Sequence, residues 1–192
     1  MKKIFLLLTI MLIGCSSEVH VAPAFEKTIL TDTASVHAIL NDNGINNNYI
    51  LEGQDHHNHE IKVSDLISLE RENVYIKTNH DIDELESKYD YTEKVEVHFW
   101  QSPKSTLNLF EKIIEDTNFE INLTGIIKLN EEYESLKECK QKKIIIDHNV
   151  LNVFEKDYGI EVVSSFGLEP ENEPTPNQIS LMIKSAQENS IN

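Results

Sequence analysis

The chain has 192 residues, with 33 acidic and 17 basic side chains and a formal net charge of −16 at pH 7. This acidic composition argues against a protein that binds nucleic acid or anionic membrane patches, because both ligands repel negative charge. The length suits one ordinary domain or two small lobes.

The N-terminus has the pattern of an export signal followed by a lipidation site. Two lysines precede an apolar run, Ile4–Ile13, which is too short to span a bilayer and sits where signal peptides sit. Cys15 follows small and apolar residues, as in a lipobox. We predict a signal peptide over residues 1–14, lipid attachment at Cys15, and a tether over residues 15–27 on the periplasmic or cell-surface side of a membrane. The alternatives are a plain signal peptide with an unrelated cysteine, or a buried N-terminal helix.

Short strands and helices alternate along the rest of the chain, which is typical of an α/β protein with parallel sheets. In the first half, apolar periodicity and capping residues set the expected elements. These are a helix over Ala34–Asn41, a strand over Tyr49–Leu51, a helix from Ser64 to Arg71 with Leu66, Ile67 and Leu69 facing inward, and strands over Val74–Ile76 and Val95–Phe99.

The second half is expected to contain longer helices. Pro103 predicts a helix N-terminus, and apolar residues that recur every three or four positions from Ile126 to Leu136 predict a second, long helix. The run Ile144–Ile146 is wholly apolar, as in a buried parallel strand. The remaining expected elements are a helix from Val150 to Gly159, a strand over Val162–Phe166 and a helix that begins at the capping segment Thr175–Gln178.

Three groups of residues carry the candidate metal ligands, and each contains histidine, whose neutral imidazole is a good zinc ligand. The first group could instead be a polar surface loop, and the histidine of the second could be a buried core residue. The third group follows an expected parallel strand, at the end where α/β folds bind ligands. The groups are Asp55–Glu60 with His56, His57 and His59, then Glu96–Trp100 with His98, and then Asp147–His148.

The remaining polar neighbours are less informative. Their carboxylates either orient the histidines or are surface charges. They are Asp55, Glu60, Glu96 and Asp147. Three further histidines have no supporting context and are taken as surface or core residues: His20, His37 and His80.

Several motif classes are excluded. The chain lacks the closely paired ligands of a zinc finger, the His-Glu-x-x-His of zincins, a glycine-rich phosphate loop and a Gly-x-Ser-x-Gly elbow. Once Cys15 is lipidated, Cys139 is the only remaining thiol, which excludes an intrachain disulfide. No catalytic motif remains.

In their order, the histidine groups resemble the signature segments of the zinc-binding branch of metal ABC-transporter substrate-binding proteins. Asp55–Asp65 is similar to the family's Asp-Pro-His-x-Tyr-Glu-x-Lys-Pro-Ser-Asp, and this register places the first ligand on His57. Glu96–Pro103 is similar to the family's Asp-Pro-His-x-Trp with a following proline, so that His98 matches the second ligand.

The resemblance continues to the C-terminus. Ile146–Ile160 resembles the family's strand, ligand histidine and helix ending in Tyr-Gly-Leu, with His148 as the third ligand, and Glu173–Pro176 resembles a Glu-Pro-Ser-Pro segment. A histidine at the third position is similar to the zinc branch. The resemblance therefore implies that Zn²⁺ is bound by His57, His98 and His148, and that His59, Glu60 and Asp147 support these ligands or replace one of them.

The resemblance also implies a fold and a role. The fold is two small α/β lobes with parallel sheets, joined by a long helix, with the metal between them. This assigns residues 28–122 to the first lobe, 123–142 to the connecting helix and 143–192 to a second lobe that is incomplete, because family members continue with further strand–helix units. The implied role is capture of zinc by a monomer and delivery to an ABC permease in the inner membrane, without catalysis.

Two other functions are the alternatives. A truncated lipoprotein with the same ligands would buffer metal or contact a partner without a role in transport. A zinc hydrolase with three histidine ligands would need a general base above a metal-bound water, and no motif supplies one.

Overall fold

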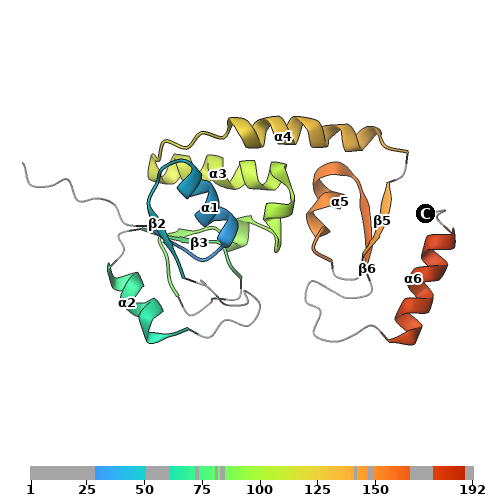
Figure 1. The fold of residues 1–192 in the computed structure, drawn as a ribbon, viewed down its shortest axis with the longest axis horizontal. Coiled ribbons are helices and arrows are strands. Elements are labelled where there is room, and N and C mark those ends of the chain that lie inside the picture. The colour runs from blue at the N-terminus through green and yellow to red at the C-terminus, as the bar shows by residue number, and fades with distance from the viewer. Residues whose placement is uncertain are drawn as a thin grey trace, which may run out of the picture.

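The computed structural model describes residues 29–50, 61–71, 74–80, 82, 85–140, 142–146, 149–164 and 175–188. Figure 1 shows two α/β lobes side by side, with helix α4 (Thr124–Glu134) running along the top from one toward the other. The first lobe contains a four-stranded sheet and the second a two-stranded sheet, and every strand pair is parallel. The predicted α/β class, with parallel sheets in two lobes, is confirmed.

The first lobe has the strand order β2-β1-β3-β4. Its strands are β1 (Ile29–Thr31), β2 (Asn47–Tyr49), β3 (Val74–Lys77) and β4 (Tyr89–Asp90), and its helices are α1 (Ala34–Asp42), α2 (Val63–Arg71) and α3 (Pro103–Thr117).

Alternate residues of the central strands β1 and β3 face two different hydrophobic cores, as the pleat of a strand requires. Ile29 and Ile76 belong to the larger core, which α1 and α3 complete with residues that include Phe110. Leu30 and Tyr75 belong to a smaller core on the other face. The sheet is therefore covered on both faces, as is usual for parallel strands.

Helix α3 begins where the sequence predicts. The side chain of Ser102 accepts a hydrogen bond from the backbone N–H of Ser105 at 3.2 Å, and Pro103 occupies the first turn. At the other end Asn118 adopts a left-handed conformation with φ 58° and ends the helix. Local sequence therefore predicts where this helix begins and ends.

The expected strand over Val95–Phe99 is wrong. Two 3₁₀ turns, η1 (Thr92–Lys94) and η2 (Phe99–Gln101), occupy this part of the chain instead. His98 and Phe99 are consecutive and both buried, so the segment does not alternate between two faces. The left-handed backbone of His98, with φ 62°, prevents an extended strand at this point.

The expected inward face of the second helix is also largely wrong. Leu66 and Ile67 of α2 are 46% and 41% exposed, and only Leu69 packs partly against the smaller core. The periodicity predicted a helix correctly, but it did not predict which of its apolar residues are buried.

The second lobe follows the connecting segment, in which α4 is continued by the 3₁₀ turn η3 (Ser135–Glu138). Its elements are β5 (Lys143–Ile146), α5 (Asn152–Tyr158), β6 (Glu161–Ser164) and α6 (Pro176–Glu188). Strand β5 is only half-buried, not fully buried as expected, because its one described neighbouring strand is β6.

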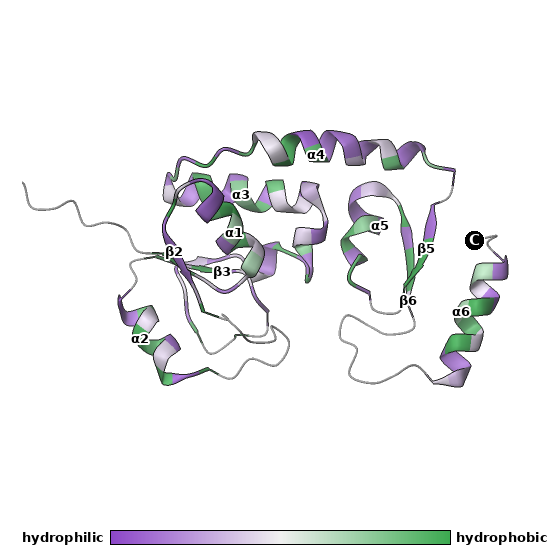
Figure 2. Ribbon diagram, in the orientation of Figure 1, coloured by the Kyte–Doolittle hydropathy of each residue, from purple (hydrophilic) through white to green (hydrophobic). Residues whose placement is uncertain are grey.

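The last helix has the predicted capping box. The N–H of Gln178 donates to the Thr175 hydroxyl at 3.3 Å, and the N–H of Thr175 donates back to the Gln178 side chain at 2.8 Å. Figure 2 shows apolar residues along α6, and Ile179, Leu181 and Ile183 are exposed.

Within the described ranges, none of the helices is both long and apolar enough to cross a bilayer. The predicted signal peptide, Cys15 and the tether all lie outside the described residues.

Candidate metal centre

A cavity of about 220 Å³ lies at the carboxyl edge of the four-stranded sheet. β1 ends at Thr31 and β3 at Lys77, and the residues directly after each strand line the cavity. The carboxyl edge of a parallel sheet is where α/β proteins bind their ligands. The lining residues are Asp32, Thr33, Ala34, Ser35, Tyr49, Thr78, Asn79, His80, Glu96, Val97, His98, Phe99 and Trp100.

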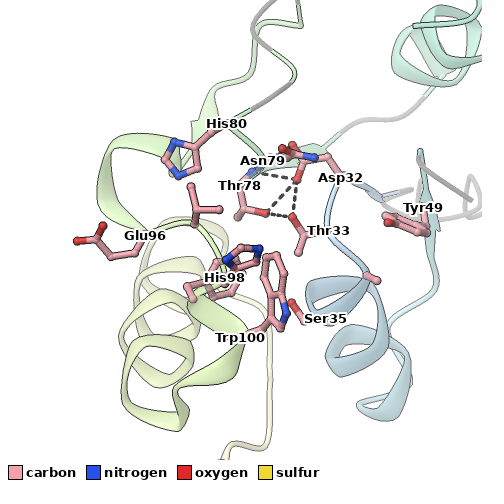
Figure 3. A pocket seen from close by; sticks show the side chains of 13 residues that line it. Asp32, Thr33, Ser35, Tyr49, Thr78, Asn79, His80, Glu96, His98 and Trp100 are labelled. Atoms are coloured by element: carbon pink, nitrogen blue, oxygen red, sulfur yellow. Dashed lines mark hydrogen bonds between the residues drawn. The ribbon is translucent and has the colours of Figure 1, made fainter. Parts of the chain in front are cut away.

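Asp32, one of the lining residues, joins the ends of β1 and β3 (Figure 3). Its carboxylate accepts hydrogen bonds from the backbone N–H of Thr78 at 3.0 Å and of Asn79 at 3.2 Å. The hydroxyl of Thr78 donates to it at 2.9 Å, and the hydroxyl of Tyr75 donates at 3.0 Å. Asp32 therefore fixes the loop that carries the cavity-lining residues after β3.

The charge of Asp32 acts on its surroundings because the side chain is fully buried. Burial raises the pKa of Asp32, and the hydrogen bonds from Thr78 and Asn79 oppose this shift. Burial also raises the pKa of Tyr49, and the nearby charge of Asp32 raises it further. The phenol of Tyr49 thus stays protonated at neutral pH and is a poor metal donor.

His98 is the predicted ligand that the structure describes. It is 2% exposed, lines the cavity, and lies edge-on to the indole of Trp100 with ring centroids 5.4 Å apart. Its left-handed backbone conformation is unusual for a residue with a side chain. Non-glycine residues in this conformation cluster at binding sites, where the surrounding structure holds them in place.

His80 also lines the cavity, although its sequence context gave no reason to select it. It is exposed, and it follows β3 on the loop that Asp32 holds. Its Nε2 lies 3.0 Å from the backbone carbonyl of Val95. The structure therefore brings a second imidazole, 18 positions earlier in the chain, to the same cavity as His98.

Glu96 lies at the side of the cavity and pairs with a residue of the second lobe. Its carboxylate is 2.8 Å from the ammonium group of Lys156 in α5. This hydrogen bond raises the pKa of Lys156. Of the two roles considered for Glu96, that of a charge paired at the surface fits this contact, since both side chains are about half exposed or more.

The other predicted site residues fall outside the described residues. They are Cys15, His57, His59, Glu60, Asp147 and His148. In the part of the chain that is described, no three His, Cys, Asp or Glu side chains lie close enough together to hold a metal ion. The ligand set inferred from the resemblance thus has one described member, His98, and the other ligands remain predictions.

Asp32 and His80 are the residues that sequence reasoning missed. Asp32 directly follows β1, and His80 lies three positions after β3, near the strand ends at which α/β folds bind ligands. A strand over Val74–Ile76 was expected, so this rule could have selected His80, whereas no strand was expected directly before Asp32. Their partners Thr78 and Val95 are 46 and 15 positions away, and this pairing is not visible in the sequence.

Comparison with protein families gives a match over most of the chain. The family model described as the periplasmic component A of the zinc-uptake complex (ZnuA) matches residues 18–192. Among individual proteins, the zinc-binding lipoprotein AdcA of Streptococcus pneumoniae is 29% identical over 108 residues. That alignment covers 49% of this chain but only 22% of AdcA, so the chain spans less than a quarter of this relative.

Solved structures match over more of the chain. One is the laminin-binding protein Lmb of Streptococcus agalactiae, described as an adhesin with metal-transporting activity. It has a TM-score of 0.65 at 15% identity, and the alignment covers 86% of this chain and 77% of the Lmb chain. The Zn(II)-bound ZnuA-like domain of Streptococcus pneumoniae AdcA has a TM-score of 0.62 at 19% identity, with coverage of 85% and 76%. At these identities the likeness establishes the fold.

Proposed function

Because the chain belongs to the family of the periplasmic zinc-uptake component A, we propose that it is an extracytoplasmic lipoprotein that binds Zn²⁺ and delivers it to an ABC permease in the inner membrane. The observation that carries this proposal is the buried His98 in a left-handed conformation, on the wall of a cavity at the carboxyl edge of the sheet. A preorganised imidazole in such a cavity is suited to bind a small cation.

The proposed ligands are His57, His98 and His148, each with a ring nitrogen about 2.0–2.1 Å from the metal. Residues His59, Glu60 and Asp147 would support these rings or replace one of them. Imidazole donors favour zinc over harder ions such as manganese. The strongly acidic chain, with a net charge of −16, also attracts cations to its surface.

The proposed role is binding and release without catalysis. Zinc hydrolysis requires a general base poised above a metal-bound water. The one described carboxylate beside His98 in sequence, Glu96, is paired with Lys156. Lipid attachment at Cys15 would hold the protein, as a monomer, on the outer side of the membrane beside its permease.

Isothermal titration calorimetry of the metal-free protein at pH 7.5 tests zinc binding. We expect one zinc ion per chain for the wild type and a large loss of affinity in His98→Asn. The matched control is His37→Gln, because both ring nitrogens of His37 lie within hydrogen-bond distance of Asn47 and Asn41, at 2.7 and 3.0 Å, and the residue is not in the cavity lining. An unchanged affinity in His98→Asn would refute the assignment.

Growth in zinc-poor medium separates transport from buffering. A strain that lacks the gene should grow more slowly there, and zinc should restore growth. The wild-type gene should complement the defect, whereas the gene for His98→Asn should not. If the deletion strain takes up ⁶⁵Zn at the wild-type rate, the protein buffers metal without feeding a permease.

A further inference from the structure

The cavity beside His98 contains more candidate donors than the predicted ligands account for. Three histidine ligands leave one position of a tetrahedral zinc site to be filled. The described donors that line the cavity, other than His98, are Asp32, Tyr49, His80 and Glu96. Their hydrogen bonds and charges differ, and these differences decide which of them has a lone pair to offer.

Asp32 has no lone pair directed at the cavity. Its Oδ1 accepts from the N–H and the hydroxyl of Thr78, and its Oδ2 accepts from the N–H of Asn79 and the hydroxyl of Tyr75. A carboxylate oxygen with two donors already on it is saturated. To bind a metal, Asp32 would have to release the loop after β3.

Tyr49 and Glu96 are also poor candidates. Tyr49 is a protonated phenol, since burial and the charge of Asp32 both disfavour its ionised form. Glu96 is paired with Lys156, and Figure 3 shows its side chain pointing away from the other labelled residues. Neither residue presents a charged donor to the space beside His98.

His80 differs from these three. Its Nε2 lies 3.0 Å from the carbonyl oxygen of Val95, and a carbonyl can only accept a hydrogen bond, so Nε2 carries the proton. The neutral ring then has its lone pair on Nδ1. Among the residues that the structure describes, Nδ1 has no hydrogen-bond partner. Histidines that bind metals commonly donate their second ring N–H to a backbone carbonyl, which fixes the tautomer in this way.

We propose that His80 is a further metal-binding residue of this cavity and supplies the fourth donor through Nδ1. This inference rests on the zinc-binding function proposed above. Because His80 is exposed and His98 is buried, the bond between zinc and His80 would be the one that solvent reaches first. A fourth ligand of this kind lets the site hold zinc and still exchange it.

Nuclear magnetic resonance of the ¹⁵N-labelled histidine rings tests the proposal directly, with zinc chloride added to the metal-free full chain. The signals of His80 are assigned by their loss in His80→Gln. One equivalent of zinc should shift Nδ1 of His80 to the range of a metal-bound nitrogen and leave its Nε2 protonated. If the rings of other histidines shift and those of His80 do not, the inference is wrong while zinc binding stands. If no ring shifts, both proposals fail.

Affinity supplies the second measurement. Loss of one of four donors in His80→Gln should weaken zinc binding by roughly tenfold or more, and His37→Gln should leave it unchanged. His80 is exposed and lies outside both hydrophobic cores, so the variant should fold, which circular dichroism checks. Equal affinities of His80→Gln and wild type would overturn the inference.

Discussion

The hydroxyl of Ser102 donates a hydrogen bond to the carboxylate of Asp157 at a distance of 2.5 Å. This contact joins the N-terminus of α3 in the first lobe to α5 in the second. Ser105 donates to the same carboxylate oxygen at 2.6 Å, and both Ser102 and Asp157 are buried. Beside them, the hydroxyl of Tyr158 accepts from the N–H of Lys104 at 3.2 Å and donates to Asn130 of α4. The two lobes and the connecting helix therefore share one buried polar network.

Replacing Asp157 with Ala should destabilise the protein by roughly 1.5–3 kcal/mol, because the network loses a charged acceptor and leaves buried hydroxyl donors unsatisfied. Urea denaturation measures the change. Lys156→Gln is the matched control on the same helix. Its ion pair with Glu96 is largely exposed, so its loss should cost less than about 1 kcal/mol. Equal effects of the two variants would contradict the role given to the network.

Removing the carboxylate of Asp32 should loosen the loop after β3. Asp32→Ala leaves the buried N–H group of Thr78 and the partly buried N–H group of Asn79 without their acceptor, at a cost of roughly 2–3 kcal/mol. Asp32→Asn keeps an acceptor oxygen and should cost less. Hydrogen exchange of the Thr78 and Asn79 amides reports the local effect, and faster exchange in the Ala variant than in the Asn variant is the expected result.

The stability of the fold should depend on the ionisation of Asp32. Burial raises its pKa above the usual 3.8, so the folded chain binds this proton more tightly than the unfolded chain. The free energy of unfolding therefore falls as the pH rises from 3.8 through the pKa of Asp32 in the folded chain. Above that pKa, the stability contributed by the bound proton is lost completely. Urea titrations between pH 4 and pH 8 should show wild type losing stability relative to Asp32→Asn. A relative gain with rising pH would contradict this assignment.

The left-handed conformation of His98 allows its proposed role in zinc binding to be tested apart from its effect on the backbone. Alanine at this position should be strained, whereas glycine adopts φ 62° without a steric penalty. We expect His98→Gly to exceed His98→Ala in stability by up to about 1 kcal/mol, since the cost of a left-handed residue outweighs the greater chain entropy of glycine. Both variants should lose zinc affinity equally in calorimetry. Unequal affinities would mean that backbone strain, not the imidazole, controls binding.

Zinc affinity should decrease as the solution becomes acidic. Protons compete with the metal for imidazole nitrogens, so binding should weaken below about pH 6. Competition with a chromogenic chelator of known proton dependence measures the affinity between pH 5.5 and pH 8. If the affinity were constant over this interval, carboxylates and not histidines would have to be the main ligands.

Much of the fold was predictable because it depends on neighbouring residues. The α3 N-terminus at Ser102 and Pro103, and the capping box of Thr175 and Gln178, are local hydrogen-bonded units, and both appear as expected. The alternation of short strands and helices likewise predicted a parallel α/β fold. The prediction of a strand over Val95–Phe99 was wrong. Its apolar residues alternate as in a strand, but the left-handed backbone of His98 is incompatible with extended structure.

The sequence by itself determined the chemical types at the site and the local elements that carry them, since both follow from residue identity and near-neighbour hydrogen bonds. It also selected His98 through a family resemblance. Only the tertiary structure decided that His80 and Asp32 belong beside His98 at one cavity. Their positions depend on the pairing of β1 with β3 and on hydrogen bonds to Thr78 and Val95, and contacts between such distant segments form only when the sheet is assembled.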